Sequence, residues 1–274
     1  MRVVAADWSG AARAEQHHLW LAECAPADGG PARLTRLEGL TRLAAADRLI
    51  ALADSDPALV AGLDFGFSLP AWYLAEAGIA TADELWADPV RLERWLAECA
   101  PPFWGRPGRR RPTLPPDQHW RRTETAAGQA GLPRPKSVFQ IGGSGAVGTA
   151  SLRGMPILDR LRRAGFAVWP MDTPRLPVVL EAWPRLHTGP LVKSQPGPRR
   201  AWLGTRRASI PAPLRRLAER SPDALDAAAA ALGLATTVRT VVDLPAIDDP
   251  VVRLEGWIWG VPLSAGRDGQ QPGH

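Results

Sequence analysis

Four aspartates stand at positions where carboxylates could converge on a divalent metal ion. Asp7 ends the first apolar run, Asp64 ends a later apolar run, and Asp223 and Asp226 lie three residues apart. Mg²⁺ prefers octahedral oxygen ligands and keeps open positions for water and phosphate. Two such ions about 3.5–4 Å apart can activate a water molecule and stabilise the leaving oxygen of a phosphodiester. The four residues therefore predict metal-dependent phosphodiester hydrolysis, with Mg²⁺ or Mn²⁺ as cofactor.

The elements around these acids should bring them to one edge of a sheet. Residues 2–7 and 58–64 are short apolar runs followed by turn residues, as buried strands are. The Ser-Pro dipeptide before Asp223 fits the N-cap and first position of a helix. Because residues three apart face the same way on a helix, Asp223 and Asp226 could lean together over the ends of the two strands.

Each acid also has a structural interpretation, which the sequence leaves open. An acid in the first turn of a helix, such as Asp223, is favoured by the helix dipole. Asp7 and Asp64 could simply cap strand ends. Asp226 lies deeper, among alanines and leucines, where an unpaired acid would be costly. Glu181 lies inside an apolar strand-like run and is either a metal-site acid or the partner of a nearby arginine.

Seven short motifs follow one another along most of the chain. They are residues 7–10, 62–70, 121–124, 145–148, 181–184, 221–227 and 255–258. In these motifs the chain resembles a family of largely uncharacterised proteins described as predicted nucleases with an RNase H-like fold. The resemblance implies an α/β fold, a mixed five-stranded sheet flanked by helices, and a metal site at the strand ends, by analogy with RuvC-type and RNase H-type enzymes.

The resemblance also extends the candidate site. It implies that Ser9, Arg121, Arg122 and Glu124 lie at the substrate. Arg121 would contact a phosphate or tether an acid, and Glu124 would ligate metal or orient water; a surface ion pair is the alternative for both. The implied catalytic acids are Asp7, Asp64, Glu181, Asp223 and Asp226, with the four aspartates as metal ligands.

A glycine-rich motif at residues 143–148 supports a competing interpretation. It satisfies GxGxxG and follows the strand-like residues 137–141, as in a dinucleotide-binding oxidoreductase. The rest of the chain lacks the alternating strands and helices of such a fold. In the nuclease interpretation, Ser144 and Gly145 could instead aim backbone N–H groups at a substrate phosphate. ATP binding of the sugar-kinase and actin-like type is disfavoured because no glycine-rich phosphate loop follows Asp7.

Composition narrows the class of protein. A chain of 274 residues, 45% of them hydrophobic, can bury one large core. Two cysteines and five scattered histidines offer neither a disulfide framework nor a zinc site. The sequence has no signal-like start and no apolar segment long enough to span a bilayer, so we expect a cytoplasmic protein without a membrane partner. No heptad or other interface pattern indicates an oligomeric state.

Positive charge is concentrated in one segment. The chain carries +5 overall, and residues 101–136 hold eight basic residues against two acids, a balance of +6. Arginines there alternate with Trp104 and Trp120, which suits phosphate contact and base stacking. The segment predicts a nucleic-acid partner; a solvated insertion without a partner is the alternative. Only Lys136 and Lys193 of the 33 basic residues are lysines.

These observations predict one RNase H-like domain over residues 1–263. It should open with a meander of strands at 2–7, 19–25 and 33–39, then a helix at 43–54. A helical and basic insertion should cover about 70–136, and residues 264–274 should form a disordered tail. The expected function is a metal-dependent nuclease, a hydrolase. The alternative is an RNase H-like domain that binds nucleic acid or another partner without cleaving it.

Overall fold

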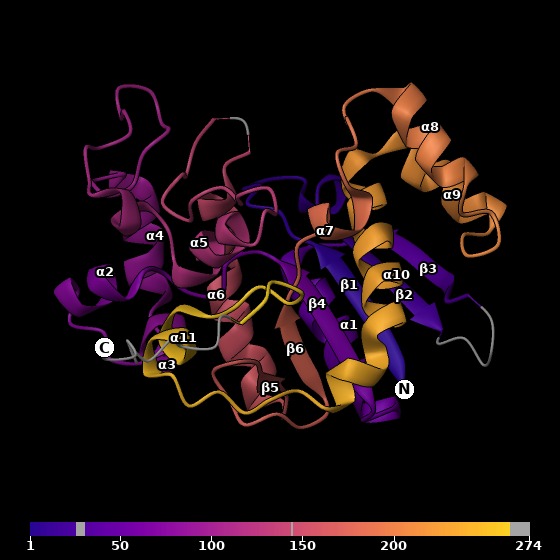
Figure 1. The fold of residues 1–274 in the computed structure, drawn as a ribbon, viewed down its shortest axis with the longest axis horizontal. Helices are drawn as coiled ribbons and strands as arrows, with labels where there is room; N and C mark the ends of the chain where they lie inside the picture. The colour runs from indigo at the N-terminus through magenta and orange to yellow at the C-terminus, as the bar shows by residue number, and fades with distance from the viewer. Residues whose placement is uncertain (26–30, 144, 264–274) are drawn as a thin grey trace, which may run out of the picture.

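A mixed six-stranded sheet forms the centre of the computed structural model, which describes residues 1–25, 31–143 and 145–263 (Figure 1). Its order is β3-β2-β1-β4-β6-β5, and β2 is antiparallel to both neighbours while the other pairs are parallel. One more strand is present than the five expected, and the shortest of the six lies at an edge. The strands are β1 (Arg2–Asp7), β2 (Trp20–Ala25), β3 (Arg33–Gly39), β4 (Leu59–Asp64), β5 (Ala167–Val168) and β6 (Val178–Glu181).

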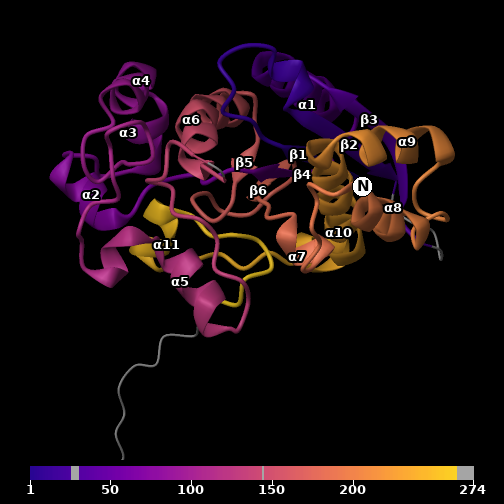
Figure 2. The ribbon, with the colours of Figure 1, turned by 90° about the horizontal axis from the view of Figure 1, so that it is seen from above.

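Helices cover both faces of this sheet. Figure 2 shows α1 and α6 on one face and α10 on the other. The shorter helices α2–α5 and α11 form the left side of Figure 1, and α8 and α9 form its upper right corner. The helices are α1 (Arg42–Ser55), α2 (Ala71–Glu76), α3 (Ala82–Trp86), α4 (Pro89–Glu98), α5 (Arg122–Gln129), α6 (Val147–Arg163), α7 (Arg185–Thr188), α8 (Pro196–Gly204), α9 (Ala212–Arg220), α10 (Pro222–Val242) and α11 (Pro250–Glu255), with 3₁₀ turns η1 (Glu15–His17) and η2 (Pro116–His119).

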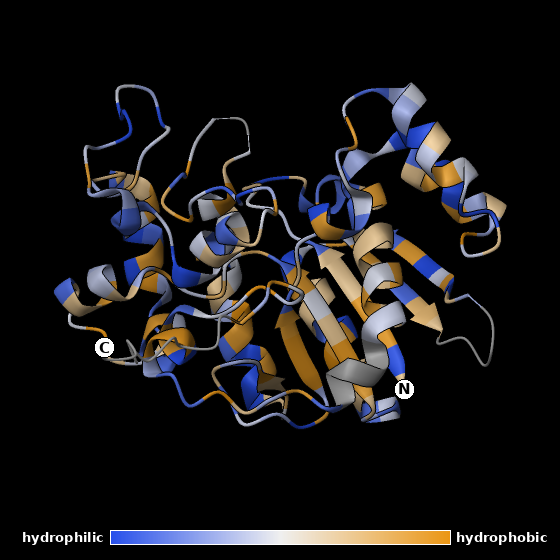
Figure 3. Cartoon of the chain, viewed as in Figure 1, coloured by the Kyte–Doolittle hydropathy of each residue, from blue (hydrophilic) through white to orange (hydrophobic). Residues whose placement is uncertain are grey.

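The central strands are apolar on both sides, as strands buried between two helical layers must be (Figure 3). Successive side chains of a strand point to opposite faces. Val3 and Ala5 belong to the core under α10, whereas Val4 and Ala6 belong to the core under α1 and α6. The same alternation decides to which face the last residue of each strand points.

Helix α10 lies unusually close to β4. A Cβ atom added to Gly62 would lie 2.3 Å from Cδ1 of Leu234 and 3.0 Å from Cβ of Ala182. Alanines 227–231 of α10 are buried against the sheet, where their small side chains let the helix backbone come close. The helix lies mainly over β1 and β2 and meets β4 at Gly62 through Leu234.

Several sequence predictions of element boundaries are confirmed. Helix α1 covers the expected residues 43–54, and α10 begins where the Ser-Pro signal placed it. The Ser221 hydroxyl accepts a hydrogen bond from the N–H of Ala224 at 3.1 Å, which satisfies one otherwise free donor of the first turn.

Between β4 and α6 the chain forms the expected helical segment followed by an irregular basic one. Helices α2–α4 fill residues 71–98, and the basic residues lie mainly on the irregular stretch 99–115 and around α5. The predicted tail, residues 264–274, lies outside the described residues. Within the described part of the chain, none of the helices combines the length and the apolar character needed to cross a membrane.

Candidate functional site

Asp7 and Asp64 lie side by side at the carboxyl ends of two neighbouring parallel strands. The register of β1 and β4 pairs these residues directly. Ala6 and Leu63 point to the α1 and α6 side, so Asp7 and Asp64 both point to the α10 side. The two carboxyl groups are close enough to share a hydrogen bond when one of them is protonated. The sheet thus brings together two acids that are 57 positions apart in the sequence.

The pKa values of this pair are strongly perturbed. Burial raises the pKa of Asp7 well above its usual range, and the negative charges of Asp64 and Asp223 raise it further. Burial raises the pKa of Asp64 to about 7. Two carboxyl groups in hydrogen-bond contact must share a proton unless a cation compensates them. The pair therefore attracts positive charge at neutral pH.

Helix α10 carries the other two predicted acids, Asp223 and Asp226. Asp223, in its first turn, is partly exposed, lies 3.8 Å from Nδ1 of His18, and has a pKa raised by burial. Asp226 is only 4% exposed. Its Oδ2 pairs with Nζ of Lys193, and its buried Oδ1 has no hydrogen-bond partner within the described residues.

Two cavities meet at the end of β4. The acidic cavity, about 600 Å³, is lined by Asp7, Asp64 and Asp223; the described residues that line it include no arginine or lysine, although the charge of Lys193 lowers the pKa of each of the three acids. The basic cavity, about 490 Å³, is lined by four basic side chains in addition to the buried Arg121: Arg134, Lys136, Arg185 and Lys193. Asp64, Gly145 and Val147 line both cavities, so acidic and basic surfaces are adjacent but separate.

Glu181 points to the opposite face of the sheet from Asp64. It pairs in register with Leu63, and its neighbour Val179 belongs to the core under α1 and α6. Its two oxygens accept from Nη1 and Nη2 of Arg121 at 2.8 and 2.5 Å, and the N–H of Phe67 donates to it at 3.1 Å. Of the two interpretations of Glu181, the ion pair with an arginine is the one present here.

Arg121 is fully enclosed rather than open to substrate. Its guanidinium donates to Glu124 and Glu181, and Nη1 also donates to the carbonyl of Glu255 at 3.0 Å. Burial lowers the pKa of Arg121, but the charges of Glu124 and Glu181 outweigh burial and raise it. Burial raises the pKa of Glu124 despite the charge of Arg121. Arg121 thus tethers two acids and has no donor left for a phosphate, and Glu124 is held by Arg121.

The other predicted substrate contacts are dispersed. Ser9 lines the acidic cavity, and its hydroxyl accepts from the N–H of Ala11. Gly145 lines both cavities with a φ of 73°. Arg122 does not join them; it pairs with Asp249 at 2.7 Å in a separate cavity of about 850 Å³. Ser144 lies outside the described residues.

The glycine-rich motif lacks the context of a dinucleotide site. Residues 137–141 form no strand; they contribute one isolated bridge, between Trp104 and Gln140. Helix α6 does follow, and its first residue, Val147, lines both cavities. The strand expected before the motif was wrong, which removes the main support for the oxidoreductase interpretation.

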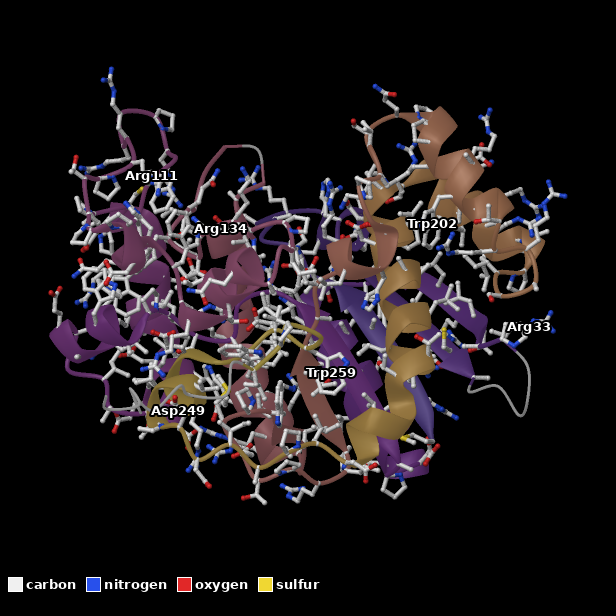
Figure 4. All side chains as sticks on the ribbon, in the orientation of Figure 1. Arg33, Arg111, Arg134, Trp202, Asp249 and Trp259 are labelled. Atoms are coloured by element: carbon white, nitrogen blue, oxygen red, sulfur yellow. The ribbon has the colours of Figure 1, made fainter. Side chains whose placement is uncertain are left out.

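The two tryptophans of the basic segment, Trp104 and Trp120, already contact arginine guanidinium groups. The guanidinium of Arg134 lies 4.6 Å from the Trp120 ring, and that of Arg111 lies 5.1 Å from Trp120 and 5.5 Å from Trp104. Figure 4 shows Arg111 and Arg134 beyond the carboxyl ends of the strands. The rings hold these arginines in place, so they do not offer free faces for base stacking.

Three residues of the site were missed in the sequence. Lys193 pairs with Asp226, His18 lies beside Asp223, and Trp8 lines the acidic cavity with a buried Nε1–H that has no acceptor among the described residues. The rarity of lysine in the chain was the available signal for Lys193. No pattern in the sequence singled out His18.

Comparison with known proteins adds no assignment. No protein-family model matches the chain, and neither curated proteins nor solved structures contain a match. Within residues 1–25, 31–143 and 145–263, no group of three or more histidine, cysteine or acidic side chains is positioned to hold a metal ion. The function must therefore be argued from the acids and the cavities themselves.

Proposed function

We propose that this chain hydrolyses phosphodiester bonds of nucleic acid with the help of Mg²⁺ or Mn²⁺, on an RNase H-like domain. The order of elements supports the fold: three antiparallel strands, helix α1, and then β4 parallel to β1. The observation that carries the function is the Asp7–Asp64 pair, aligned at the carboxyl ends of the central strands β1 and β4. The pKa values of both acids are raised, and a basic cavity lies next to them.

The residues present fit a divalent cation. Asp7 and Asp64 lie close together although both are acids, and Oδ1 of Asp226, a residue that lines neither cavity, is buried without a partner among the described residues. Carboxylate oxygens are the ligands that Mg²⁺ and Mn²⁺ prefer. Asp7 and Asp64 would hold the ion, with Asp223 and Asp226 approaching from α10. When bound, a divalent ion makes a water molecule more acidic and stabilises a phosphoryl oxygen.

The chain's own residues would orient the substrate for attack by water. Lys193 reaches from the basic cavity to Asp226, so a phosphate bound in this cavity would lie next to the acids. Arg121 keeps the charge of Glu181 paired on the other face of the sheet. In the reaction, the oxygen of water bonds to phosphorus, the P–O bond to the leaving oxygen breaks, and the proton that the water gives up balances the one that the leaving oxygen takes up.

A non-catalytic binding domain is the second candidate. It is favoured by the ion pair between Lys193 and Asp226, which already neutralises one predicted ligand. In that case the basic cavity would bind a phosphate, and Asp7 and Asp64 would have a structural role at the carboxyl ends of β1 and β4.

The test is cleavage of single-stranded, duplex, hybrid and branched nucleic acids with Mg²⁺ or Mn²⁺. We expect cleavage by the wild type and by Asp54→Asn, a change of an exposed acid at the end of α1, but none by Asp7→Asn. Thermal unfolding would show whether Asp7→Asn is folded. Equal cleavage by Asp7→Asn would remove Asp7 from the mechanism. No cleavage by any of the three proteins would favour the binding domain.

A further inference from the structure

The basic cavity has a composition that the chain as a whole does not predict. The sequence contains 31 arginines and two lysines, yet both lysines line this one cavity. An ammonium group is a compact, strongly hydrated point charge that binds phosphate without demanding bidentate geometry. Both ammonium groups are therefore placed to attract a phosphate into this cavity.

The four basic side chains come from two segments on either side of the cavity. Arg134 and Lys136 belong to the stretch between α5 and α6, where Trp120 supports Arg134 and Lys136 lies against Gly145. Arg185 belongs to α7 and Lys193 follows it. Arg134 and Lys136 are exposed and have no carboxylate partner among the described residues, so their charge is free for a ligand.

The charges of the cavity's own acids are compensated. Glu124 and Glu181 are both paired with Arg121, so the four cations face Asp64 in the lining and Asp226 through its pair with Lys193. An anionic ligand would therefore meet net positive charge in this cavity and negative charge just beyond it. A phosphate group fits the first environment and not the second.

The size of the cavity limits the ligand. A volume of about 490 Å³ lies within the range of pockets that enclose one small molecule, about 300–1,000 Å³. It has room for an unpaired nucleotide, whereas a base pair with both backbones would need to lie outside it. The neighbouring acidic cavity continues the space toward Asp7.

We propose that the basic cavity binds the phosphate and sugar of an unpaired nucleotide in a single strand, held by Arg134, Lys136, Arg185 and Lys193. This proposal rests on the proposed function for the path of the nucleic acid, which would run from the basic cavity toward Asp7 and Asp64. It deepens that function by naming the substrate class as single-stranded rather than duplex nucleic acid.

The test is binding of a fluorescent single-stranded oligonucleotide with a 5′-phosphate, in EDTA, by anisotropy over a range of salt concentrations. The variant Arg134→Ala/Lys136→Ala removes two phosphate contacts. Its slope of log affinity against log salt should fall by about 1.4, so that a variant with the affinity of the wild type at 1 M salt binds roughly 60-fold more weakly at 50 mM. Lys136→Arg, which keeps the charge, should retain the wild-type slope.

The control is Arg33→Ala/Arg207→Ala, which removes the same charge from exposed positions outside both cavities. Figure 4 places Arg33 at the far side of the sheet from Arg134. The control should bind like the wild type. Equal loss in the control, unchanged binding by Arg134→Ala/Lys136→Ala, or equally tight binding of the duplex form would each overturn the proposal.

The two proposals can fail separately. If the wild type binds the strand with the expected slope but cleaves nothing with Mg²⁺ or Mn²⁺, phosphodiester hydrolysis fails and the binding site stands. If the wild type cleaves nucleic acid and Arg134→Ala/Lys136→Ala binds and cleaves equally well, the binding site fails and hydrolysis stands.

Discussion

Replacement of Arg121 distinguishes a tether from a phosphate ligand. The guanidinium is 1% exposed and compensates Glu124 and Glu181, which are 1% and 3% exposed. Arg121→Met would leave both carboxylates buried and unpaired. Breaking a buried pair in this way costs about 3–5 kcal/mol. For a chain of this size, that lowers the melting temperature by roughly 6–20 °C.

The adjacent Arg122 provides a matched control. Its side chain is about half exposed and pairs with Asp249 at the surface, so Arg122→Met should cost about 1 kcal/mol or less. Glu181→Gln added to Arg121→Met removes one of the unpaired charges and should recover part of the loss. Differential scanning calorimetry measures all four proteins.

The result that would refute this reasoning is a stable Arg121→Met protein. If its melting temperature matched that of the wild type while its affinity for single-stranded nucleic acid fell, Arg121 would be a phosphate ligand. The hydrogen bonds to Glu124 and Glu181 would then contribute little to stability.

Two further predictions concern the acid pair and the helix above it. The pKa of Asp64 is raised to about 7, so its contribution to stability is complete below about pH 4 and is lost as the pH rises through 7. In EDTA, urea unfolding should show the wild type losing up to about 1.4 kcal/mol per pH unit relative to Asp64→Asn over that range; parallel curves for the two proteins would contradict the raised pKa. Gly62→Ala forces Cβ against Leu234 and should cost about 1–3 kcal/mol in the same assay, whereas Gly204→Ala, with no atom within 4 Å, should be neutral or slightly stabilising. A neutral Gly62→Ala would mean that the Leu234 side chain can turn aside without loss of packing.

Strand ends and helix starts were predictable because their signals are local. The apolar runs ending at Asp7 and Asp64, and the Ser-Pro start of α10, depend on residues within a few positions of one another. The proximity of Asp7 and Asp64 needed only that β1 and β4 be neighbours in the sheet, although β2, β3 and α1 lie between them in the chain.

The partners of the buried groups could not be predicted in the same way. Whether Glu181 faces the metal side or the opposite side depends on the register of β6 against β4, and a shift of one residue reverses it. Likewise Lys193 and Asp226 are 33 positions apart, and their pairing depends on how α7 packs beside α10. Sequence patterns specify which residues are costly to bury, but not which distant residue compensates them.

The hydrogen bonds of Arg121 to Glu124, Glu181 and Glu255 also affect local unfolding of the molecule. They join α5 to β6 and to the segment after α11, where the N–H of Trp259 donates to the carbonyl of Glu181 at 2.8 Å and the N–H of Ile258 donates to Thr123 at 3.0 Å. Local opening of any of these segments would separate buried ionic groups, at a cost of about 3–5 kcal/mol. We therefore expect α5, β6 and the segment after α11 to open together, so that amide hydrogen exchange in the three segments shows similar protection.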